Sequence, residues 1–343
     1  MATIDDVAKS AGVSKSTVSN VFSQKRPISK EISERVLEAA RELNYKPNYW
    51  ARSLANKETR IIGLNMEGDK VKFGQFRMTL LNGVLKECYN QGYRLLVNTL
   101  PKHFTNRLEN WSSDPVDGEI LLDPMVRDPR IEERVAGGIP IVVIGRPPES
   151  HESTVSYVSS DNVGAGRLVT EYLIGLGHRN ILFLNAPEYR TVSHERFDGY
   201  RKALEMAELP VESSLVVYRD KVFGSSEEYG YIMAKRLLSE NPSITAIITD
   251  TDKVACGVYQ AAEELKLVIP RDLSVFAFSL ETSYGTQLQP PVSSMRLNGE
   301  LLGSEAAKML LNLCASKTPI IKRVIIPWEL IHRESCGPVK VVQ

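Results

Sequence analysis

The stretch TIDDVAKSAGVSKSTVSNVF, residues 3–22, has the pattern of two short helices joined by a tight turn. Thr3 is expected to cap the first helix, because a threonine hydroxyl can accept a hydrogen bond from a first-turn amide. Gly12 is expected to end that helix with positive φ, a conformation that glycine adopts without steric cost. Ser14 is expected to cap the second helix. This one stretch therefore predicts a helix, a turn and a second helix.

Apolar residues are spaced so that these helices pack on each other. The expected contacts are made by Ile4, Val7, Ala8 and Ala11 on the first helix and by Val18 and Val21 on the second. A small residue at the crossing, a glycine in the turn and a β-branched residue on the second helix are typical of a helix-turn-helix. SKEISERVLEAARELNY predicts a third helix, with Ser29 as its cap. The residues expected to cover the pair are Ile32, Val36, Leu37, Ala40 and Leu43.

The outward side of the second helix carries Lys15, Ser16, Ser19 and Asn20, which are polar and short enough to contact base edges in a major groove. Residues 1–60 hold 11 Lys+Arg and 7 Asp+Glu, so the remaining chain holds 31 against 35. A basic head on a mildly acidic body favours a nucleic-acid partner for the head. The alternative is a small three-helix unit whose polar residues are only solvated and bind no DNA, because such a unit would show the same spacing.

DVAKSAGVSKSTVSNVFSQ, followed by VLEAARELNYKPN, closely resembles the N-terminal domain of the LacI/GalR family of bacterial transcription regulators. The resemblance implies operator binding by a homodimer, with Thr3, Ser14 and Thr17 joining the residues above at the DNA. It also implies a hinge helix in the minor groove with Leu54 wedged into a base step, whereas the alternative is that Leu54 packs on the body. The hinge residues expected at the DNA are Asn48, Ala51, Arg52, Leu54 and Ala55.

From residue 60 onward, short apolar runs such as IIGLNM, GEILLD and TAIITD alternate with amphipathic stretches. Runs rich in Val, Ile and Leu between helices indicate parallel sheets covered on both faces, so the body is expected to be α/β with two lobes. It resembles the periplasmic-binding-protein-like (type I) core of the same family, in which a ligand binds between the lobes. The expected divisions are an all-α head at 1–46, a linker at 47–59, a first lobe at 60–160 plus 291–321, a second lobe at 161–290 plus 322–337, and a tail at 338–343.

The resemblance also implies which residues contact an effector. They are Phe76, Arg77, Arg146, Asp161, Arg196, Phe223, Thr251, Asp252 and Ser279. An aspartate at the position of Asp161 accepts sugar hydroxyls in relatives, and Arg196 matches an arginine that clamps effectors. Ser279 stands where many sugar-binding members carry aspartate, so an anionic effector stays open beside an oligosaccharide. The alternative is that Asp161 and Arg196 pair with each other or with neighbours to hold the lobes.

Catalytic chemistry has little support, because the chain has no P-loop and no HExxH, and its five histidines share no metal-like spacing. No enzyme activity, metal or cofactor is therefore expected. His178 is expected to close a helix, and Asp252 to lie at a helix N-terminus rather than to form an acid–base pair with Asp250. Four scattered cysteines and the lack of an apolar run of membrane-spanning length favour a cytoplasmic protein.

The sequence therefore predicts a dimeric repressor of carbohydrate-utilisation genes, controlled by a sugar or sugar phosphate in the cleft between the lobes. One alternative is a regulator whose co-repressor is a phosphorylated carrier protein. An alternative from another class, a solute-binding protein or enzyme, is opposed by the helix-turn-helix and by the missing catalytic motifs.

Overall fold

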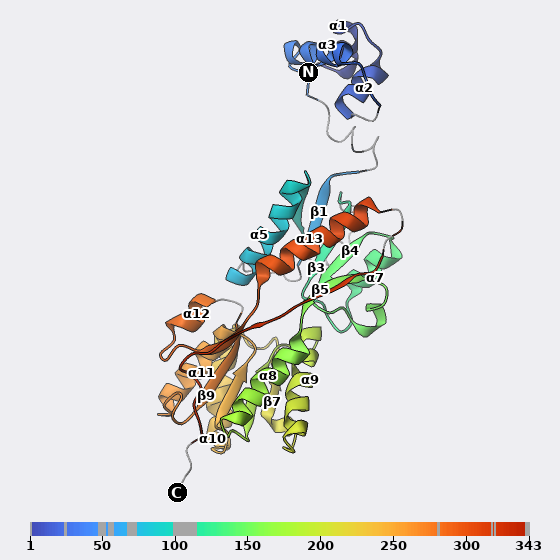
Figure 1. Cartoon of the computed structure of the whole chain (residues 1–343). Helices are drawn as coiled ribbons and strands as arrows, with labels where there is room; N and C mark the ends of the chain where they lie inside the picture. The colour runs from blue at the N-terminus through green and yellow to red at the C-terminus, as the bar shows by residue number, and fades with distance from the viewer. Residues whose placement is uncertain are drawn as a thin grey trace. The chain divides into compact units, whose positions relative to one another are not determined.

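The computed structural model describes residues 2–23, 26–46, 53, 58–66, 74–98, 115–279, 282–316, 318 and 320–339. The chain divides into two compact units, Met1–Arg60 and Ile61–Gln343, which are called the head and the body below (Figure 1). The head is helical and the body contains two six-stranded sheets with helices, as the sequence predicts.

The head contains three described helices, α1 (Ile4–Ser10), α2 (Lys15–Ser23) and α3 (Lys30–Glu42). The predicted cap of α1 is confirmed, because Thr3 Oγ1 accepts a hydrogen bond from the Asp6 N–H at 3.3 Å and the Asp6 carboxylate accepts one from the Thr3 N–H at 2.8 Å. Gly12 has a φ of 62°, as predicted. Ser14 Oγ accepts a hydrogen bond from the Thr17 N–H at 3.1 Å and so caps α2.

The core of the head confirms most of the predicted apolar face and corrects one part of it. Its buried residues are Val7, Ala8, Ala11, Val18, Val36, Ala39 and Ala40. Leu37 and Leu43 were expected to cover the first two helices, but both are exposed, at 38% and 37%. Ala39 is buried instead, because the narrow buried face of α3 consists of its smaller apolar residues, Val36, Ala39 and Ala40.

The first lobe of the body is built on a parallel sheet in the order β11-β5-β4-β3-β1-β2. Helices α5 and α13 lie together on one face of this sheet (Figure 1), and α7 packs against β4. Successive residues of β3 (Gly118–Leu122) pack on opposite faces of the sheet. Ile120 and Leu122 pack on the side of α5 and α13, and Leu121 packs with Ile131 of α7. The elements are β1 (Ile61–Asn65), α5 (Gln75–Asn90), β2 (Arg94–Asn98), β3 (Gly118–Leu122), α7 (Pro129–Ala136), β4 (Ile141–Ile144), η2 (Glu149–His151), β5 (Ser156–Ser160), α13 (Gly299–Ala315) and β11 (Arg323–Ile326).

The second lobe repeats this architecture with a sheet in the order β12-β10-β9-β8-β6-β7. Helices α8 and α9 cover one face and α10 and α11 cover the other. Its strands are parallel except β12, which runs antiparallel to β10. The elements are α8 (Asn162–Gly175), β6 (Ile181–Asn185), α9 (Thr191–Met206), η3 (Ser213–Leu215), β7 (Val216–Tyr218), α10 (Ser226–Glu240), β8 (Ala246–Thr249), α11 (Asp252–Glu264), β9 (Ser274–Ser279), α12 (Thr282–Gln287), β10 (Ser293–Arg296) and β12 (Glu329–Ile331).

The end of the chain crosses between the lobes differently from the prediction. The strand β10 was expected in the first lobe within 291–321, but it pairs with β9 of the second lobe. The strand β11 was expected in the second lobe within 322–337, but it pairs with β5 of the first. The prediction was wrong because short apolar runs do not show which sheet has an open edge to receive them. The chain therefore crosses after β5, after β10 and after β11 (Figure 1).

Three pairs of helices in the body cross through paired glycines. A β-carbon at any of these positions would collide with a backbone carbonyl of the partner helix, so the backbones touch directly. The pairs are Gly83 and Gly303 for α5 and α13, Gly166 and Gly199 for α8 and α9, and Gly230 and Gly257 for α10 and α11. Close approach, rather than turn geometry, therefore requires glycine in the middle of these helices.

Candidate functional site

The outward side chains of α2 are accessible, as the sequence predicts. Lys15, Ser16 and Ser19 are exposed, and Asn20 is half-buried. Lys15 Nζ lies 2.9 Å from a carboxylate oxygen of Asp5, but the two side chains are 61% and 56% exposed. An ion pair as exposed as this is worth little, so it leaves Lys15 available to a phosphate or a base.

The hydroxyls at the start of α2 form a small cluster. Ser14 Oγ lies 2.7 Å from Ser16 Oγ and 2.9 Å from Thr17 Oγ1. Hydroxyl groups both donate and accept, so these can turn toward a phosphate oxygen without leaving a buried group unpaired. The predicted hinge residues Asn48, Ala51, Arg52, Leu54 and Ala55 lie outside the described residues.

A cavity of about 370 Å³ lies between the two lobes of the body. It is lined at the carboxyl ends of strands from both sheets, by Leu122 at the end of β3, Ser160 at the end of β5 and Asp250 after β8. Open parallel sheets commonly bind ligands at this edge. Five predicted effector residues line the cavity, which are Phe76, Arg77, Arg196, Thr251 and Asp252.

Arg196, on α9, is held at the cavity by charge and by aromatic rings. Its Nη1 donates to Asp250 Oδ1 at 2.7 Å and to the Asp250 carbonyl at 3.2 Å. Its Cζ lies 4.0 Å from the ring centre of Phe278 and 5.4 Å from that of Trp328. The side chain is 3% exposed, and this burial lowers the pKa of the guanidinium while the Asp250 carboxylate opposes the effect. Arg196 thus pairs within the second lobe, and no contact with Asp161 is involved.

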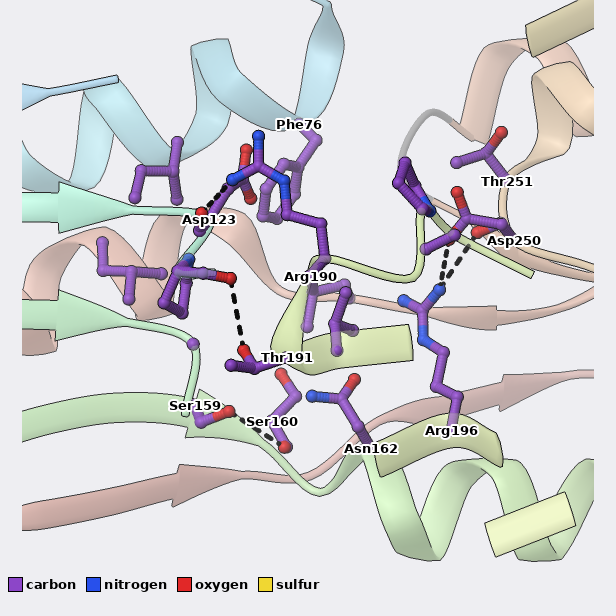
Figure 2. A pocket seen from close by; sticks show the side chains of 18 of the residues that line it. Phe76, Asp123, Ser159, Ser160, Asn162, Arg190, Thr191, Arg196, Asp250 and Thr251 are labelled. Atoms are coloured by element: carbon purple, nitrogen blue, oxygen red, sulfur yellow. Dashed lines mark hydrogen bonds and ion pairs between the residues drawn. The ribbon is translucent and has the colours of Figure 1, made fainter. Parts of the chain in front are cut away.

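On the opposite wall, Asp123 joins arginines from both lobes. Arg77 Nη2 of α5 lies 3.3 Å from Asp123 Oδ2. Arg190, which precedes α9 in the second lobe, donates from Nη1 to the Asp123 carbonyl. Figure 2 shows Arg190 extending to Asp123 while Arg196 turns back to Asp250. Arg190 and Arg196 are only six residues apart, yet Arg190 contacts the first lobe and Arg196 pairs within the second.

Backbone contacts join the lobes beside Arg190. The Thr191 N–H donates to the Pro124 carbonyl at 3.2 Å, and the Val126 N–H donates to the Tyr189 carbonyl at 2.9 Å. Met125 and Arg190 form an antiparallel bridge between these bonds. We call these contacts between 124–126 and 189–191 the clasp. Because Arg190 belongs to the clasp and also lines the cavity, a ligand there can act on the lobe contact directly.

Thr251 and Asp252 lie where α11 begins. The Thr251 hydroxyl accepts a hydrogen bond from the Val254 N–H at 3.3 Å and caps the helix. Asp252 is the first residue of α11 and is 1% exposed, which confirms its predicted place at a helix N-terminus. Asp250 does not form an acid–base pair in this segment, because its carboxylate pairs with Arg196.

Three predicted effector residues do not line the cavity. Asp161 Oδ1 accepts a hydrogen bond from the Gly164 N–H at 2.8 Å and caps α8. Phe223 packs on Tyr229, with 5.2 Å between ring centres, and joins the core of the second lobe. Arg146 pairs with Glu152 at 3.0 Å. The motif positions therefore do not place these three side chains at the cavity, because matching a motif position does not determine side-chain direction, and their effector contacts stay predictions. Of the ninth residue, Ser279, the structure describes only the backbone, at the end of β9.

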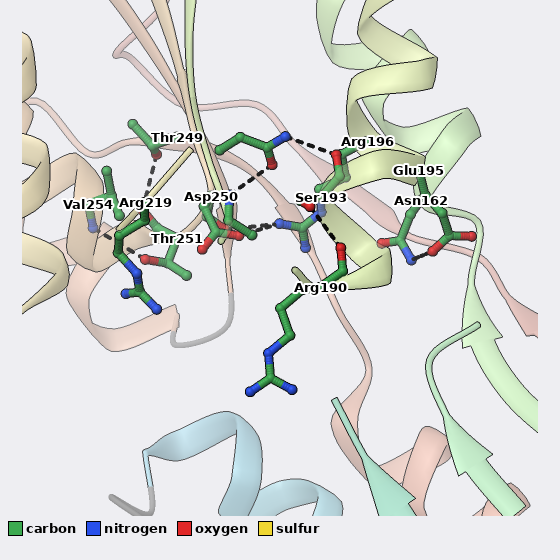
Figure 3. A network of polar contacts seen from close by, with 12 residues as sticks. Asn162, Arg190, Ser193, Glu195, Arg196, Arg219, Thr249, Asp250, Thr251 and Val254 are labelled. Carbon is green, nitrogen blue, oxygen red and sulfur yellow. Dashed lines mark hydrogen bonds and ion pairs between the residues drawn. The ribbon is translucent and has the colours of Figure 1, made fainter. Parts of the chain in front are cut away.

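Arg146 also faces a half-buried carboxylate of the other lobe. Its Nη1 lies 3.9 Å from Oε1 of Glu195, which is on α9. Asn162 donates from Nδ2 to Glu195 Oε2 at 2.9 Å (Figure 3). Burial raises the pKa of Glu195 to about 7, although Asn162, Arg146 and Arg196 each act to lower it. A carboxyl group that changes charge near neutral pH therefore lies at the lobe junction.

Several residues that line the cavity were not predicted from the sequence. They are Asp123, Arg190, Arg219, Asp250, Lys253 and Trp328. For Asp123 and Asp250 a signal existed, because each directly follows a buried strand whose carboxyl end faces the cleft. Arg190, Arg219 and Trp328 lie in connecting segments, whose direction depends on tertiary contacts and left no pattern in the sequence.

His178 has a structural role that is wider than the predicted end of a helix. It follows α8 and is 2% exposed, and its ring nitrogens lie 2.9 Å from Thr245 Oγ1 and 3.0 Å from Ser274 Oγ. Nε2 also lies 3.1 Å from the Gly337 carbonyl, so the ring joins α8 to the end of the chain.

Among the described residues no group of His, Cys, Asp and Glu could hold a metal ion. In the part of the chain that the structure describes, no helix is long and apolar enough to span a bilayer.

A helix-turn-helix head and a two-lobed body with an inter-lobe cavity define the class of ligand-responsive DNA-binding regulators. Residues 3–48 match the family model of bacterial regulatory proteins of the lacI family, and residues 170–336 match that of the periplasmic binding protein-like domain. The HTH-type transcriptional repressor PurR of Haemophilus influenzae is 32% identical over 343 residues, covering 98% of each chain. The chain belongs to the LacI family, whose members are transcription regulators and not enzymes.

Solved structures show the same architecture over nearly the whole chain. The complex of the transcriptional regulator CelR with cellobiose is 28% identical, with a TM-score of 0.74, and covers 98% of this chain and 100% of its own. The lac repressor dimer bound to operator and the anti-inducer ONPF has a TM-score of 0.80 at 23% identity, covering 98% and 99%. The protein is thus a LacI-family DNA-binding transcription regulator with a periplasmic-binding-protein-like effector domain.

Proposed function

We propose that the protein is a repressor of carbohydrate-utilisation genes, controlled by a small carbohydrate-type effector in the cavity between the lobes. The cavity carries this proposal, because polar groups of both lobes line it and about 370 Å³ lies within the range of small-molecule sites. A ligand that contacts both lobes binds one lobe arrangement more tightly than another, and it therefore shifts the balance between them.

On the DNA side, α2 is the proposed recognition helix. Lys15, Ser16, Ser19 and Asn20 are proposed to face base edges, and the Asn20 amide suits the N6/N7 edge of adenine. The hydroxyls of Thr3, Ser14 and Thr17 are proposed to contact the DNA as well. The proposed hinge contacts, from the family resemblance, are Asn48, Ala51, Arg52, Leu54 and Ala55.

The clasp supports a route from the effector to the DNA. Arg190 lines the cavity and also bridges to Met125 of the first lobe, so an effector that pairs with Arg190 alters the contact between the lobes. A change of lobe angle in one protomer moves its hinge relative to that of the other protomer. Operator affinity then depends on the effector through the coupling between the two sites.

A carbohydrate suits the cavity because the lining offers an aromatic ring together with hydrogen-bonding groups. Phe76 supplies a face on which a sugar ring can stack, and Asp123, Asn162 and Thr251 can bond to hydroxyls. CelR, which is similar over the whole chain, has been solved with cellobiose.

A homodimer is proposed because α5 presents an apolar face outward. Met78, Leu85 and Tyr89 are 44%, 43% and 86% exposed on this helix, and Val97 on the edge strand β2 is 37% exposed. A second copy of the chain is the proposed occupant, since a pseudo-palindromic operator needs two heads. Leu85→Asp should dissociate the dimer in analytical ultracentrifugation, and a dimer that survives this change would place the interface elsewhere.

Operator binding in the presence of candidate effectors tests the proposed function. Sites selected from random DNA by the full-length protein would be labelled and titrated by fluorescence anisotropy, with and without mono- and disaccharides. We expect at least one sugar to change operator affinity by about fivefold or more. If no sugar acts but a phosphorylated carrier protein does, the co-repressor alternative replaces this proposal. Failure to select any DNA sequence would contradict the DNA-binding role of the head.

A further inference from the structure

The two walls of the cavity differ in chemistry. The first lobe contributes a largely apolar wall that includes Phe76, Leu122, Ile144, Leu297 and Leu302. The second lobe contributes four cations, Arg190, Arg196, Arg219 and Lys253. A ligand that fits both walls has an apolar face at one side and acceptor groups at the other.

The described residues of the lining carry more positive than negative charge. Its cations are the four of the second lobe and Arg77, which makes five, and its three carboxylates are Asp123, Asp250 and Asp252. Two ion pairs lie within this set, Arg77 with Asp123 and Arg196 with Asp250. Among the described residues of the lining, five cations stand against three carboxylates, and this balance favours an anionic ligand.

Arg219 is a cation of this lining that has no carboxylate partner among the described residues. It follows β7 and is half-buried, and its Nη1 donates to Ser226 Oγ at 2.5 Å. Among the residues that the structure describes, no carboxylate is within ion-pair distance of Arg219, and its sequence neighbour Asp220 does not line the cavity. Figure 3 shows Arg219 and Arg190 extending from the second lobe toward the first. A guanidinium fixed by one hydroxyl keeps further donors for a ligand.

Buried donors in the same lining also have no acceptor among the described residues. They are Nε of Arg196, which is 3% exposed, Nε1 of Trp328, and the hydroxyl of Ser160, which is 6% exposed. Guanidinium and indole N–H groups can only donate. Leaving such groups unpaired is costly, so the cavity favours a ligand rich in acceptor oxygens.

We infer that the effector is an anionic carbohydrate, a sugar phosphate or a sugar acid, whose anionic group is bound by Arg219. Its sugar ring lies against Phe76 on the first lobe, and its remaining oxygens accept from the donors of Arg196 and Trp328. Phosphate and carboxylate share the chemistry required, since both accept two hydrogen bonds from a planar guanidinium. The inference rests on the proposed function only in identifying this ligand with the effector.

Inorganic phosphate tests the anion site without a known effector. Thermal unfolding of the full-length protein would be followed as sodium phosphate replaces sodium chloride at constant ionic strength. The variants are Arg219→Gln and, as control, Arg236→Gln, which removes an exposed arginine of α10 outside the cavity lining. General salting effects act on all three proteins alike, so the difference between variants measures specific binding.

We expect phosphate to raise the unfolding temperature of the wild type and of Arg236→Gln equally. In Arg219→Gln the fitted dissociation constant for phosphate should rise by about tenfold or more, as for loss of a charge-assisted hydrogen bond. Equal phosphate responses in all three proteins would overturn the inference. If Arg219→Gln does not fold, Arg219→Lys decides, because lysine keeps the charge but lacks the planar fork and should bind phosphate more weakly than the wild type. A phosphate response of Arg219→Lys equal to that of the wild type would overturn the inference.

Matched sugars then separate the two kinds of anion and separate this inference from the proposed function. Calorimetry would compare glucose, glucose 6-phosphate and glucuronate, and anisotropy would record their effect on operator affinity. Tighter binding of either anionic sugar than of glucose, lost in Arg219→Gln, supports the inference. Equal or tighter binding of glucose overturns it, while leaving the proposed function intact if glucose changes operator affinity. An anionic sugar that binds through Arg219 but never alters operator affinity contradicts the proposed function instead.

Discussion

Arg146 of the first lobe and Glu195 of the second face each other across the lobe junction, with Nη1 and Oε1 3.9 Å apart. The Glu195 side chain is 13% exposed, so its charge is largely removed from water. Burial raises its pKa to about 7 against the opposing effects of Asn162, Arg146 and Arg196, and Asp161 adds to the rise. The pair therefore makes the stability of the body depend on pH.

The first prediction concerns this pH dependence. The Glu195 carboxyl ionises near 4.5 in the unfolded chain and near 7 in the folded one. Between these values the folded state binds more protons, so the free energy of unfolding should fall as pH rises, and stay level above about pH 7. The shift corresponds to roughly 3 kcal/mol at most. Glu195→Gln should match the wild type near pH 4.5 and be more stable by up to about that amount at pH 8.

Urea unfolding at pH 5, 6, 7 and 8 measures this difference. Glu205→Gln, which removes an exposed carboxylate from the same helix, is the matched control for loss of a charge. A difference between Glu195→Gln and the wild type that does not change with pH would show that Glu195 is solvated in the folded protein.

The second prediction concerns the pair of Arg196 and Asp250. Arg196→Ala should destabilise the body by about 3–5 kcal/mol, because it leaves the carboxylate of Asp250 without its partner in a buried site. The double variant Arg196→Met with Asp250→Asn should recover a large part of that loss, since methionine still covers the ring of Phe278. A double-mutant cycle with Arg196→Met, Asp250→Asn and the double variant, followed by chemical unfolding, measures the coupling, and additive effects would argue against a tight pair.

The third prediction concerns the glycine crossings. Gly257→Ala should lower the free energy of unfolding by about 2 kcal/mol or more, because the new β-carbon meets the Glu227 carbonyl of α10. Gly175→Ala is the control, since nothing lies within 4 Å of its β-carbon and alanine favours the helix by about 0.5–1 kcal/mol. Urea denaturation compares the two. Similar stabilities would mean that α10 and α11 can separate without cost.

The fourth prediction concerns base recognition by α2. Asn20→Ala should weaken binding to the selected operator by about 1–3 kcal/mol and relax the preference at one base pair of each half-site. Anisotropy titrations against operators with all four bases at each position would locate that pair. A loss that is uniform over all sequences would identify Asn20 as a phosphate contact.

Local signals predicted the head almost completely. Thr3, Gly12, Ser14 and Ser29 act as predicted, because helix caps and a left-handed turn depend on residues within one turn of the chain. Leu37 was wrongly predicted to be buried, because α3 has more apolar residues than its one narrow buried face can hold. Which of them is buried depends on the neighbouring helices and not on α3 alone.

The cavity shows the limit of the same reasoning. Phe76, Arg77 and Arg196 line it as predicted, but Asp161 caps a helix and Arg146 faces Glu195 instead. Whether a polar side chain caps a helix or faces a ligand depends on differences in direction that a motif does not encode. Paired glycines such as Gly83 and Gly303 gave no local signal either, because each is needed only against the other.

By itself the sequence determined the helix-turn-helix and the two sheets, because periodicity, caps and strand composition act over short distances along the chain. The class of protein followed from the resemblance of its motifs to a known family. Only the tertiary structure decided that β10 completes the second sheet and β11 the first, since an open sheet edge is created by strands far away in the sequence. It also decided that Arg196 pairs with Asp250, while the guanidinium of Arg219 donates to the hydroxyl of Ser226 and meets no carboxylate among the described residues. The charge of the cavity depends on these pairings. The amino-acid composition of a chain with zero net charge does not show which charged residues meet in the folded protein.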